Sequence, residues 1–371
     1  DGKEIVFQTQ CIAVGDGTNF EKYEKNPVIT ADALPEGASK IDFRDPKIWK
    51  EKDGTFRCVV GSRPADGSGQ ILLYSSKDGF SWNFEQILIQ NKNRFGKMWE
   101  CPDFFEVDGK WLLMVSPQDM MPVGLEYGAG NGTLCVAGYL DENKHFVEEY
   151  TQSIDYGIDF YAPQTVLAPD GRRIMIGWMQ NWDTCGVRED DMKWFGQTSC
   201  PREIQFVDGK LIQNPIRELS NYHKNTVSYS EVLISDCISL EKVSGRMIDL
   251  EVEIKPEDEE NCYDKFVIQF AKNESFHSDI VFYPKESVLE IDRSWSGIRR
   301  AVQHQKKCKV ADNNGSIKLR VILDRYSVEV FVNDGEQAMS MAVFTEQCAD
   351  EICFYAEGKV KANVTKSDLE F

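Results

Sequence analysis

Four Asp-Gly pairs, each lying between two apolar runs, constrain the fold of this 371-residue chain more than any other feature. They are Asp53-Gly54, Asp108-Gly109, Asp170-Gly171 and Asp208-Gly209. An Asp-Gly pair accepts the positive φ angles of a tight turn, so the runs on either side of it pair as a β-hairpin. The sequence contains no amphipathic 3.6-residue period longer than about two helical turns. It therefore predicts an all-β protein.

A weak internal repeat indicates how the hairpins of the first half are organised. The segment Gly-Asp-Gly-Thr-Asn-Phe-Glu at 15–21 resembles Lys-Asp-Gly-Phe-Ser-Trp-Asn at 77–83, and each lies between two short strands. Asp-Gly hairpins recur about every 40 to 60 residues, a length typical of the four-stranded blades of a β-propeller. An unrelated series of hairpins in a sandwich is the alternative, and the repeat favours the propeller.

The pattern changes near residue 220. After Pro215 a polar segment, 220–225, leads into runs that alternate apolar and polar residues. These runs occupy 248–254, 265–270, 318–323 and 327–332, and a tight turn follows at 333–335. Alternation with period two is typical of a β-sandwich. We therefore expect a β-propeller domain over 1–219, a linker over 220–228 and a C-terminal β-sandwich over 229–371.

The charge balance limits the classes of partner. The chain carries 42 Lys and Arg against 61 Asp and Glu, a net charge of −19. Such a surface repels phosphate backbones and anionic membranes, so we expect neither a nucleic acid nor a membrane as partner. No apolar run approaches the roughly 20 residues that cross a bilayer. A neutral small molecule is the expected ligand.

The cysteines indicate the compartment. Eleven of them are scattered along the chain without a Cys-x-x-Cys pair, and there are only four histidines. This offers no zinc-ligand spacing, and we expect neither a metal nor a cofactor. Free thiols and a cytoplasmic location are predicted. Four Asn-x-Ser/Thr sequences keep secretion open as the alternative.

Two short segments carry residues suited to acid–base chemistry on a sugar. Glu100 lies between Trp99 and Cys101. An indole and a thiol reduce the hydration of a carboxyl and favour its protonated form, which suits a general acid. Arg44 and Asp45 precede a proline that restrains the backbone, and such a pair can donate to and accept from neighbouring hydroxyls. The structural alternatives are a surface Glu at a loop end and a local ion pair at a turn.

Aromatic and amide side chains lie close together in two further segments. Asp-Phe-Tyr-Ala-Pro-Gln occupies 159–164 and Gly-Trp-Met-Gln-Asn-Trp occupies 177–182. Sugar rings stack on aromatic faces while amides bind the hydroxyls at the rim, so these groups fit a carbohydrate pocket. Ordinary core aromatics are the alternative.

Taken together, these segments resemble glycoside hydrolase family 32, which includes invertases, levanases, inulinases and sucrose-6-phosphate hydrolases. The resemblance covers essentially the whole chain. It rests on R-D-P at 44–46, M-W-E-C-P-D at 98–103, D-F-Y-A-P-Q-T at 159–165, G-W-M at 177–179, P-R-E at 201–203, I-D-R-S at 291–294, D-R at 324–325 and S-V-E-V-F-V-N-D-G at 327–335.

The resemblance implies a five-bladed β-propeller followed by a β-sandwich, and a hydrolase that cleaves β-fructofuranosyl bonds with retention. Glu100 would be the general acid/base and Asp45 the transition-state stabiliser. The substrate-binding residues would be Arg44, Trp99, Cys101, Tyr161, Trp178 and Trp182. Sucrose, sucrose 6-phosphate, inulin and levan all stay open as substrates.

One part of the family pattern is missing from the 371 residues. The family's nucleophile is an Asp in an Asn-Asp-Pro-Asn-Gly motif, and no Asn-Asp-Pro occurs in this chain. Retention requires two carboxyls about 5–5.5 Å apart. We therefore expect an N-terminal segment of the propeller, on a separate chain or on the same protein, to supply the nucleophile. A non-catalytic sucrose- or fructan-binding module and a fructosyltransferase are the alternatives.

Overall fold

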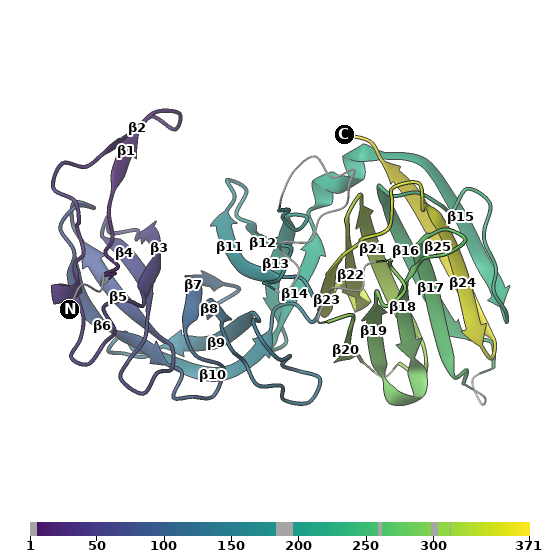
Figure 1. Cartoon of the computed structure of the whole chain (residues 1–371), viewed down its shortest axis with the longest axis horizontal. Helices are drawn as coiled ribbons and strands as arrows, with labels where there is room; N and C mark the ends of the chain where they lie inside the picture. The colour runs from purple at the N-terminus through teal and green to yellow at the C-terminus, as the bar shows by residue number, and fades with distance from the viewer. Residues whose placement is uncertain (1–5, 183–195, 259–261, 298–302, 312) are drawn as a thin grey trace. The chain divides into compact units, whose positions relative to one another are not determined.

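The computed structural model describes residues 6–182, 196–258, 262–297, 303–311 and 313–371, and its strands form two compact units (Figure 1). The first unit comprises Asp1–Pro122, Gly128–Gln152 and Ala162–Gln164. The second comprises Val123–Tyr127, Ser153–Tyr161 and Thr165–Phe371. Each unit is described by itself. The all-β prediction is confirmed, because the described helices are short 3₁₀ turns.

The first unit contains antiparallel sheets whose strands follow one another in chain order. Its strands are β1 (Ala13–Gly15), β2 (Phe20–Lys22), β3 (Phe43–Lys50), β4 (Phe56–Ser62), β5 (Gln70–Ser76), β6 (Asn83–Gln90), β7 (Trp99–Val107), β8 (Lys110–Pro117), β9 (Leu134–Leu140) and β10 (Phe146–Ser153), with the 3₁₀ turn η1 (Ala31–Ala33). The strand orders are β1-β2, β3-β4-β5-β6 and β7-β8-β9-β10. A four-stranded meander is the form of a propeller blade.

The predicted repeat corresponds to one turn that is used twice. Asp16 connects β1 to β2, and Asp78 connects β5 to β6. The Asp78 carboxylate accepts hydrogen bonds from the amides two and three positions further on, at 2.8 and 2.7 Å. Asp16 does the same at 2.9 and 2.8 Å. These bonds lower the pKa of both carboxyls, and they explain why Asp recurs at this position.

The second unit holds most of one more meander and continues into two larger sheets. Residues 162–164, in the first strand of that meander, belong to the first unit. The strands of the meander are β11 (Tyr161–Leu167), β12 (Arg173–Trp178), β13 (Arg202–Val207) and β14 (Lys210–Pro215), followed by the 3₁₀ turn η2 (Arg217–Tyr222). The later strands are β15 (His223–Ile234), β16 (Ile248–Pro256), β17 (Lys265–Lys272), β18 (Ser278–Tyr283), β19 (Val288–Asp292), β20 (Gln305–Lys309), β21 (Ile317–Asp324), β22 (Ser327–Val332), β23 (Gln337–Ala342), β24 (Glu351–Glu357) and β25 (Val360–Leu369), with η3 (Pro284–Glu286) and η4 (Asn333–Gly335). Their orders are β15-β25-β16-β21-β22-β23 and β20-β19-β18-β17-β24.

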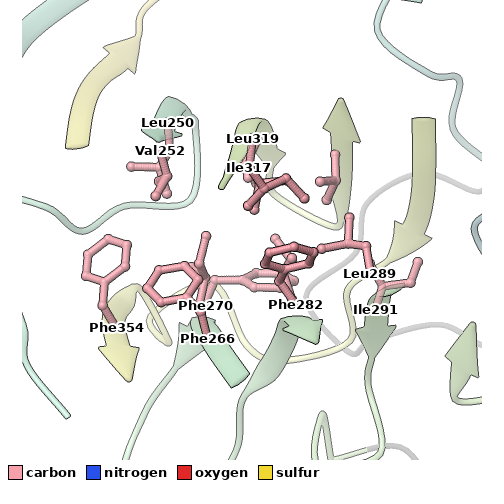
Figure 2. Close-up of a cluster of buried hydrophobic side chains, with 14 of the residues drawn as sticks. Leu250, Val252, Phe266, Phe270, Phe282, Leu289, Ile291, Ile317, Leu319 and Phe354 are labelled. Atoms are coloured by element: carbon pink, nitrogen blue, oxygen red, sulfur yellow. The ribbon is translucent and has the colours of Figure 1, made fainter. Parts of the chain in front are cut away.

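These two sheets pack face to face as the predicted sandwich. Leu250 on β16 and Leu319 on β21 point from one sheet toward Phe266 and Phe270 on β17 and Phe282 on β18 of the other (Figure 2). All five side chains are at most 2% exposed. Burial of each such side chain contributes about 1.5–3 kcal/mol. The alternating pattern in the sequence is therefore the inward face of each strand.

The segment expected to be a linker is largely a strand. Residues 217–222 form η2, and from His223 onward the chain is β15, which pairs with β25 in the register His223↔Leu369. β15 lies at the edge of its sheet, and most of its side chains are exposed. An edge strand tolerates polar residues on both faces, which explains why its sequence resembled a connector.

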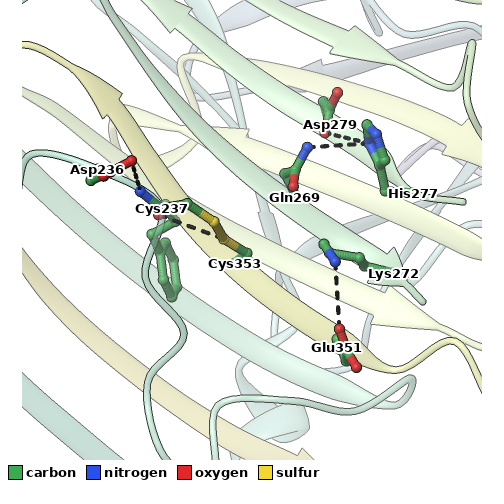
Figure 3. Close-up of a disulfide and its surroundings, with 9 residues drawn as sticks. Asp236, Cys237, Gln269, Lys272, His277, Asp279, Glu351 and Cys353 are labelled. Carbon is green, nitrogen blue, oxygen red and sulfur yellow. Dashed lines mark hydrogen bonds and ion pairs between the residues drawn. A yellow bond between two sulfur atoms is a disulfide. The ribbon is translucent and has the colours of Figure 1, made fainter. Parts of the chain in front are cut away.

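The prediction of free thiols is wrong for one pair of cysteines. Cys237 and Cys353 form a disulfide beside a cluster that includes Gln269, His277 and Asp279 (Figure 3). The backbone bridge between the next residues, Ile238 and Phe354, brings the two cysteines together although they lie 116 positions apart. Eight other cysteines carry free thiols, and Cys185 lies outside the described residues. Among the described residues no helix is long and apolar enough to cross a membrane.

Candidate active site

The first strand of each four-stranded meander begins with the same backbone irregularity. Asp45 in β3, Cys101 in β7 and Ala162 in β11 have φ angles of 62°, 49° and 52°, and a proline follows each of them. Positive φ is uncommon for residues other than glycine, and such conformations cluster at functional sites. The three meanders therefore share a special position at the start of their first strands.

At two of these positions the irregularity is a β-bulge. The β3–β4 ladder is interrupted between Arg44 and Lys47, and the β7–β8 ladder between Glu100 and Asp103. A bulge re-aims side chains that would otherwise alternate between the two faces of the sheet. Residues 44 and 45, before and at the bulge of β3, contact residues 100 and 101, before and at the bulge of β7, although the two strands belong to different sheets.

Two hydrogen bonds join the two bulges. Arg44 Nε donates to Glu100 Oε1 at 2.9 Å, and the Cys101 amide donates to Asp45 Oδ2 at 3.0 Å. The consecutive residues 44 and 45 thus hold the consecutive residues 100 and 101. We call these four residues the carboxylate clasp. The structure therefore brings together the predicted acid/base and the predicted transition-state stabiliser.

Arg44 is held on its other side as well. Its Nη1 donates to Asp42 Oδ1 at 2.9 Å and to Gln8 Oε1 at 3.3 Å. Burial lowers the pKa of Arg44, but hydrogen bonds to Asp42 and Glu100 outweigh it, so the pKa is raised overall. The guanidinium is a fixed positive charge beside Glu100. Gln8 and Asp42 were not predicted as site residues, and no motif in the sequence marks them.

The Asp45 carboxylate keeps one oxygen for a ligand. Its Oδ2 accepts from the Cys101 amide and, at 3.7 Å, from the Cys101 thiol. Burial, together with the charges of Asp45 and Glu100, raises the pKa of this thiol to about 12, so it stays a donor. Within the described part of the chain, Oδ1 of Asp45 has no hydrogen-bond partner. It can therefore accept from a sugar hydroxyl.

Trp99 has a different place from the one predicted. Its indole is completely buried, lies against Gly69 and donates its N–H to the Phe95 carbonyl at 2.9 Å. A Cβ on Gly69 would come within 2.6 Å of the indole. The ring is thus closed off from a sugar, and its packing anchors the first residue of β7.

The second unit holds the three other predicted aromatic residues in one cluster. The rings of Tyr161, Trp178 and Trp182 pack edge to face, with centroid distances of 6.5, 6.3 and 5.4 Å. Tyr161 is 4% exposed, whereas Trp182 is 54% exposed. An exposed indole supported by a buried tyrosine ring and a half-buried indole offers a face to a sugar.

A buried ion pair supports the aromatic cluster, and sequence reasoning missed it. Asp159 accepts from Arg293 and from Asn181, and its carboxylate also accepts from the Ala342 amide at 2.7 Å. Asp159 and Arg293 are both fully buried. Each lies in a segment that resembles the family, so the signal was present, but a single sequence does not show which residues pair.

The chain matches known proteins over almost its whole length. The glycosyl hydrolases family 32 N-terminal domain matches residues 2–215, and the glycosyl hydrolases family 32 C-terminal domain matches 217–370. A raffinose invertase of Escherichia coli is 32% identical over 95% of this chain and 70% of its own length. A sucrose-6-phosphate hydrolase of Bacillus subtilis is 33% identical over 98% of this chain and 73% of its own length.

Solved structures agree in fold. A family 32 β-fructofuranosidase from Bombyx mori superimposes with a TM-score of 0.80 at 30% identity, over 98% of this chain and 72% of that one. A sucrose-6-phosphate hydrolase from Lactobacillus gasseri gives a TM-score of 0.83 at 25% identity, over the same shares of the two chains. Both are five-bladed β-propellers followed by a β-sandwich, which confirms the predicted fold class. The chain belongs to glycoside hydrolase family 32.

Proposed function

We propose that this chain belongs to a retaining β-fructofuranosidase that hydrolyses terminal β-fructofuranosyl bonds. The observation that carries the proposal is the carboxylate clasp. It holds two carboxylates and a fixed cation at the start of neighbouring strands, with one oxygen of Asp45 open to a ligand. The names of the similar proteins point to the same class of reaction.

The clasp suggests a role for each of its members. Glu100 donates a proton to the leaving glycosidic oxygen and then takes one from water. Arg44 binds Oε1 of Glu100 and so orients the carboxyl group. Asp45 binds ring hydroxyls through Oδ1, and its negative charge stabilises the oxocarbenium-like transition state. The family resemblance proposes Tyr161, Trp178 and Trp182 as further sugar contacts, and they form a cluster of their own in the second unit.

The nucleophile is the part that the chain does not show. Oδ2 of Asp45 is already bound by Cys101, which leaves Asp45 suited to hold hydroxyls rather than to attack carbon. We propose that a segment with the family's Asn-Asp-Pro motif supplies the second carboxylate.

The proposed substrate is sucrose or its 6-phosphate. The similar proteins include several sucrose-6-phosphate hydrolases, and a Bombyx mori β-fructofuranosidase was solved with sucrose. The proposed location is the cytoplasm, where a phosphorylated sugar would be met, and the eight free thiols support it. Inulin and levan remain competing substrates in the test.

Fructose release from sucrose, sucrose 6-phosphate, inulin and levan tests the proposal. We expect no release by the purified 371-residue chain, and release after addition of an N-terminal segment that carries Asn-Asp-Pro. Release by the chain alone would overturn the proposed source of the nucleophile. Transfer of fructose to sugars at high sucrose would instead identify a fructosyltransferase.

The second candidate is a sugar-binding module without turnover. The binding of Asp45 Oδ2 by Cys101 favours it, because Asp45 is then suited to hold a hydroxyl rather than to attack carbon. Calorimetric binding of sucrose by the chain, together with failure of every added segment to restore fructose release, would decide for this candidate.

A further inference from the structure

Three side chains two positions after the positive-φ residues are joined to one another. Lys47 follows Asp45, Asp103 follows Cys101 and Gln164 follows Ala162. All three belong to the first compact unit. Lys47 and Asp103 are also the residues at which each ladder resumes its register after the bulge. We call Lys47, Asp103 and Gln164 the bulge tie.

The contacts within the bulge tie are short and polar. Lys47 Nζ donates to Asp103 Oδ2 at 3.1 Å and to Gln164 Oε1 at 3.1 Å. Gln164 Nε2 then donates to the Cys101 carbonyl at 2.9 Å. One lysine therefore connects β3, β7 and β11, and one amide reaches the backbone of the carboxylate clasp.

The bulge tie differs from a surface ion pair because its carboxylate is buried. The Asp103 side chain is 1% exposed and that of Lys47 is 25% exposed. A buried carboxylate that loses its cation is left with an uncompensated charge, whereas exposed pairs contribute little. Asp103 thus fixes Lys47 strongly, and Lys47 in turn orients Gln164.

We propose that the bulge tie is a positioning device that fixes the carboxylate clasp, with Lys47 and Gln164 as positioning residues. Left-handed backbone at Asp45 and Cys101 persists only where the surroundings hold it. The clasp holds the two bulges on one side, through the Cys101 amide. The bulge tie binds the next peptide group, through the Cys101 carbonyl. Both peptide groups of Cys101 are therefore held by hydrogen bonds.

Two substitutions break the bulge tie at different points. Lys47→Met keeps an unbranched side chain, one atom shorter than that of Lys, and removes its charge and its donors. Gln164→Glu keeps an acceptor for Lys47 but removes the amide that donates to the Cys101 carbonyl. Lys255→Met is the matched control, because Lys255 pairs with Glu231 at 2.8 Å while both side chains are more than half exposed.

Hydrogen exchange followed by mass spectrometry tests the proposal on the chain itself. In Lys47→Met and Gln164→Glu we expect exchange of the Cys101 amide to become about tenfold faster, with exchange in β16 and β21 unchanged. Lys255→Met should leave the Cys101 amide as it is. Unchanged exchange at Cys101 in Gln164→Glu would overturn the proposal. Faster exchange throughout the chain would show that the bulge tie only stabilises the fold, and it would also overturn the proposal.

The catalytic consequence rests on the proposed function and needs the active enzyme. We expect Lys47→Met to lower kcat for sucrose about 10- to 100-fold, and kcat for an aryl β-fructofuranoside much less, because only sucrose needs a well-placed acid. An equal loss on both substrates would contradict placement of the acid. If no fructose is released by the unaltered protein, the proposed function fails, while the exchange experiment still decides the positioning role.

Discussion

At the scale of single residues, the site contains the predicted side chains in an arrangement that the sequence did not specify. The sequence placed Arg44 and Asp45 in one segment and Glu100 in another, and chemistry indicated what each could do. Two bulges in different sheets bring these segments together, so that Arg44 binds Glu100 and the Cys101 amide binds Asp45. The family resemblance placed Trp99 at the sugar, but its indole is fully buried against Gly69.

Glu100→Gln tests the proposed acid at this scale. The amide cannot protonate a leaving oxygen, so we expect kcat for sucrose in the completed enzyme to fall about 10²- to 10⁴-fold. An aryl β-fructofuranoside, whose leaving group needs little protonation, should lose much less in the first step. Steady-state kinetics on both substrates measure this, and an equal loss on the two would contradict the role.

Trp182→Ala tests the aromatic cluster. Trp182 is the exposed member, so its removal should take a stacking face from the sugar without opening the core. We expect the Kd for sucrose to rise about 5- to 10-fold, in line with roughly 1 kcal/mol for one aromatic contact, while the melting temperature stays within a degree or two. Titration calorimetry gives the Kd. The exposed Trp295, which lies in the sandwich, provides the control as Trp295→Ala.

At the scale of elements, turns were predictable and bulges were not. Asp-Gly pairs accept positive φ, so the hairpins at Asp53-Gly54, Asp108-Gly109 and Asp208-Gly209 could be found from sequence, although in the first of them only Gly54 has a positive φ. The prolines after Asp45 and Cys101 were also visible, but a residue before proline is normally extended. Packing between neighbouring strands, rather than local preference, holds these residues at positive φ. The bulges therefore lay beyond sequence reasoning.

The connection from β13 to η2 supplies a pH-dependent test of one element. Hydrogen bonds from the Arg217 side chain, and then from its backbone and from Arg172, outweigh burial and lower the pKa of Glu203 to about 2, from 4.5. A carboxyl whose pKa is depressed in the folded state adds stability above its unfolded pKa. That stability is lost as the pH falls toward the folded value.

Glu203→Gln should therefore be less stable than the unaltered protein by roughly 1–2 kcal/mol at pH 7, and the difference should shrink between pH 4.5 and about 2. Urea unfolding at pH 7, 4 and 3 measures it. Glu24→Gln, at an exposed position in a turn, is the control. A difference that stays constant down to pH 3 would contradict the assigned ion pairing.

At the scale of the whole molecule, a buried network joins strands from both sides of the predicted domain boundary at 219, which stays a prediction. Arg202 on β13 donates to Glu329 on β22 at 2.7 Å and to Asp155 at 3.0 Å, and it also reaches Ser340 on β23 at 2.6 Å. The side chains of Arg202 and Asp155 are fully buried. The motif P-R-E predicted family resemblance but not this role, because Glu329 and Ser340 lie more than a hundred positions from Arg202 and Asp155 lies 47 positions from it.

Arg202→Met tests whether this network holds the second unit together. The substitution leaves Asp155 and Glu329 buried without their cation, so we expect a loss of about 3–5 kcal/mol in the free energy of unfolding at pH 7. Burial already raises the pKa of Glu329. Removal of Arg202 raises it further, so the folded variant takes up a proton more readily than the unfolded chain. The loss should therefore diminish as the pH falls from 7 to 5.

Urea unfolding at both pH values measures this loss. Arg94→Met, which breaks a surface pair with Glu148, is the control and should change stability by less than about 1 kcal/mol. A loss at Arg202 no greater than that control, or one that grows on acidification, would show that the network is not what unites these strands.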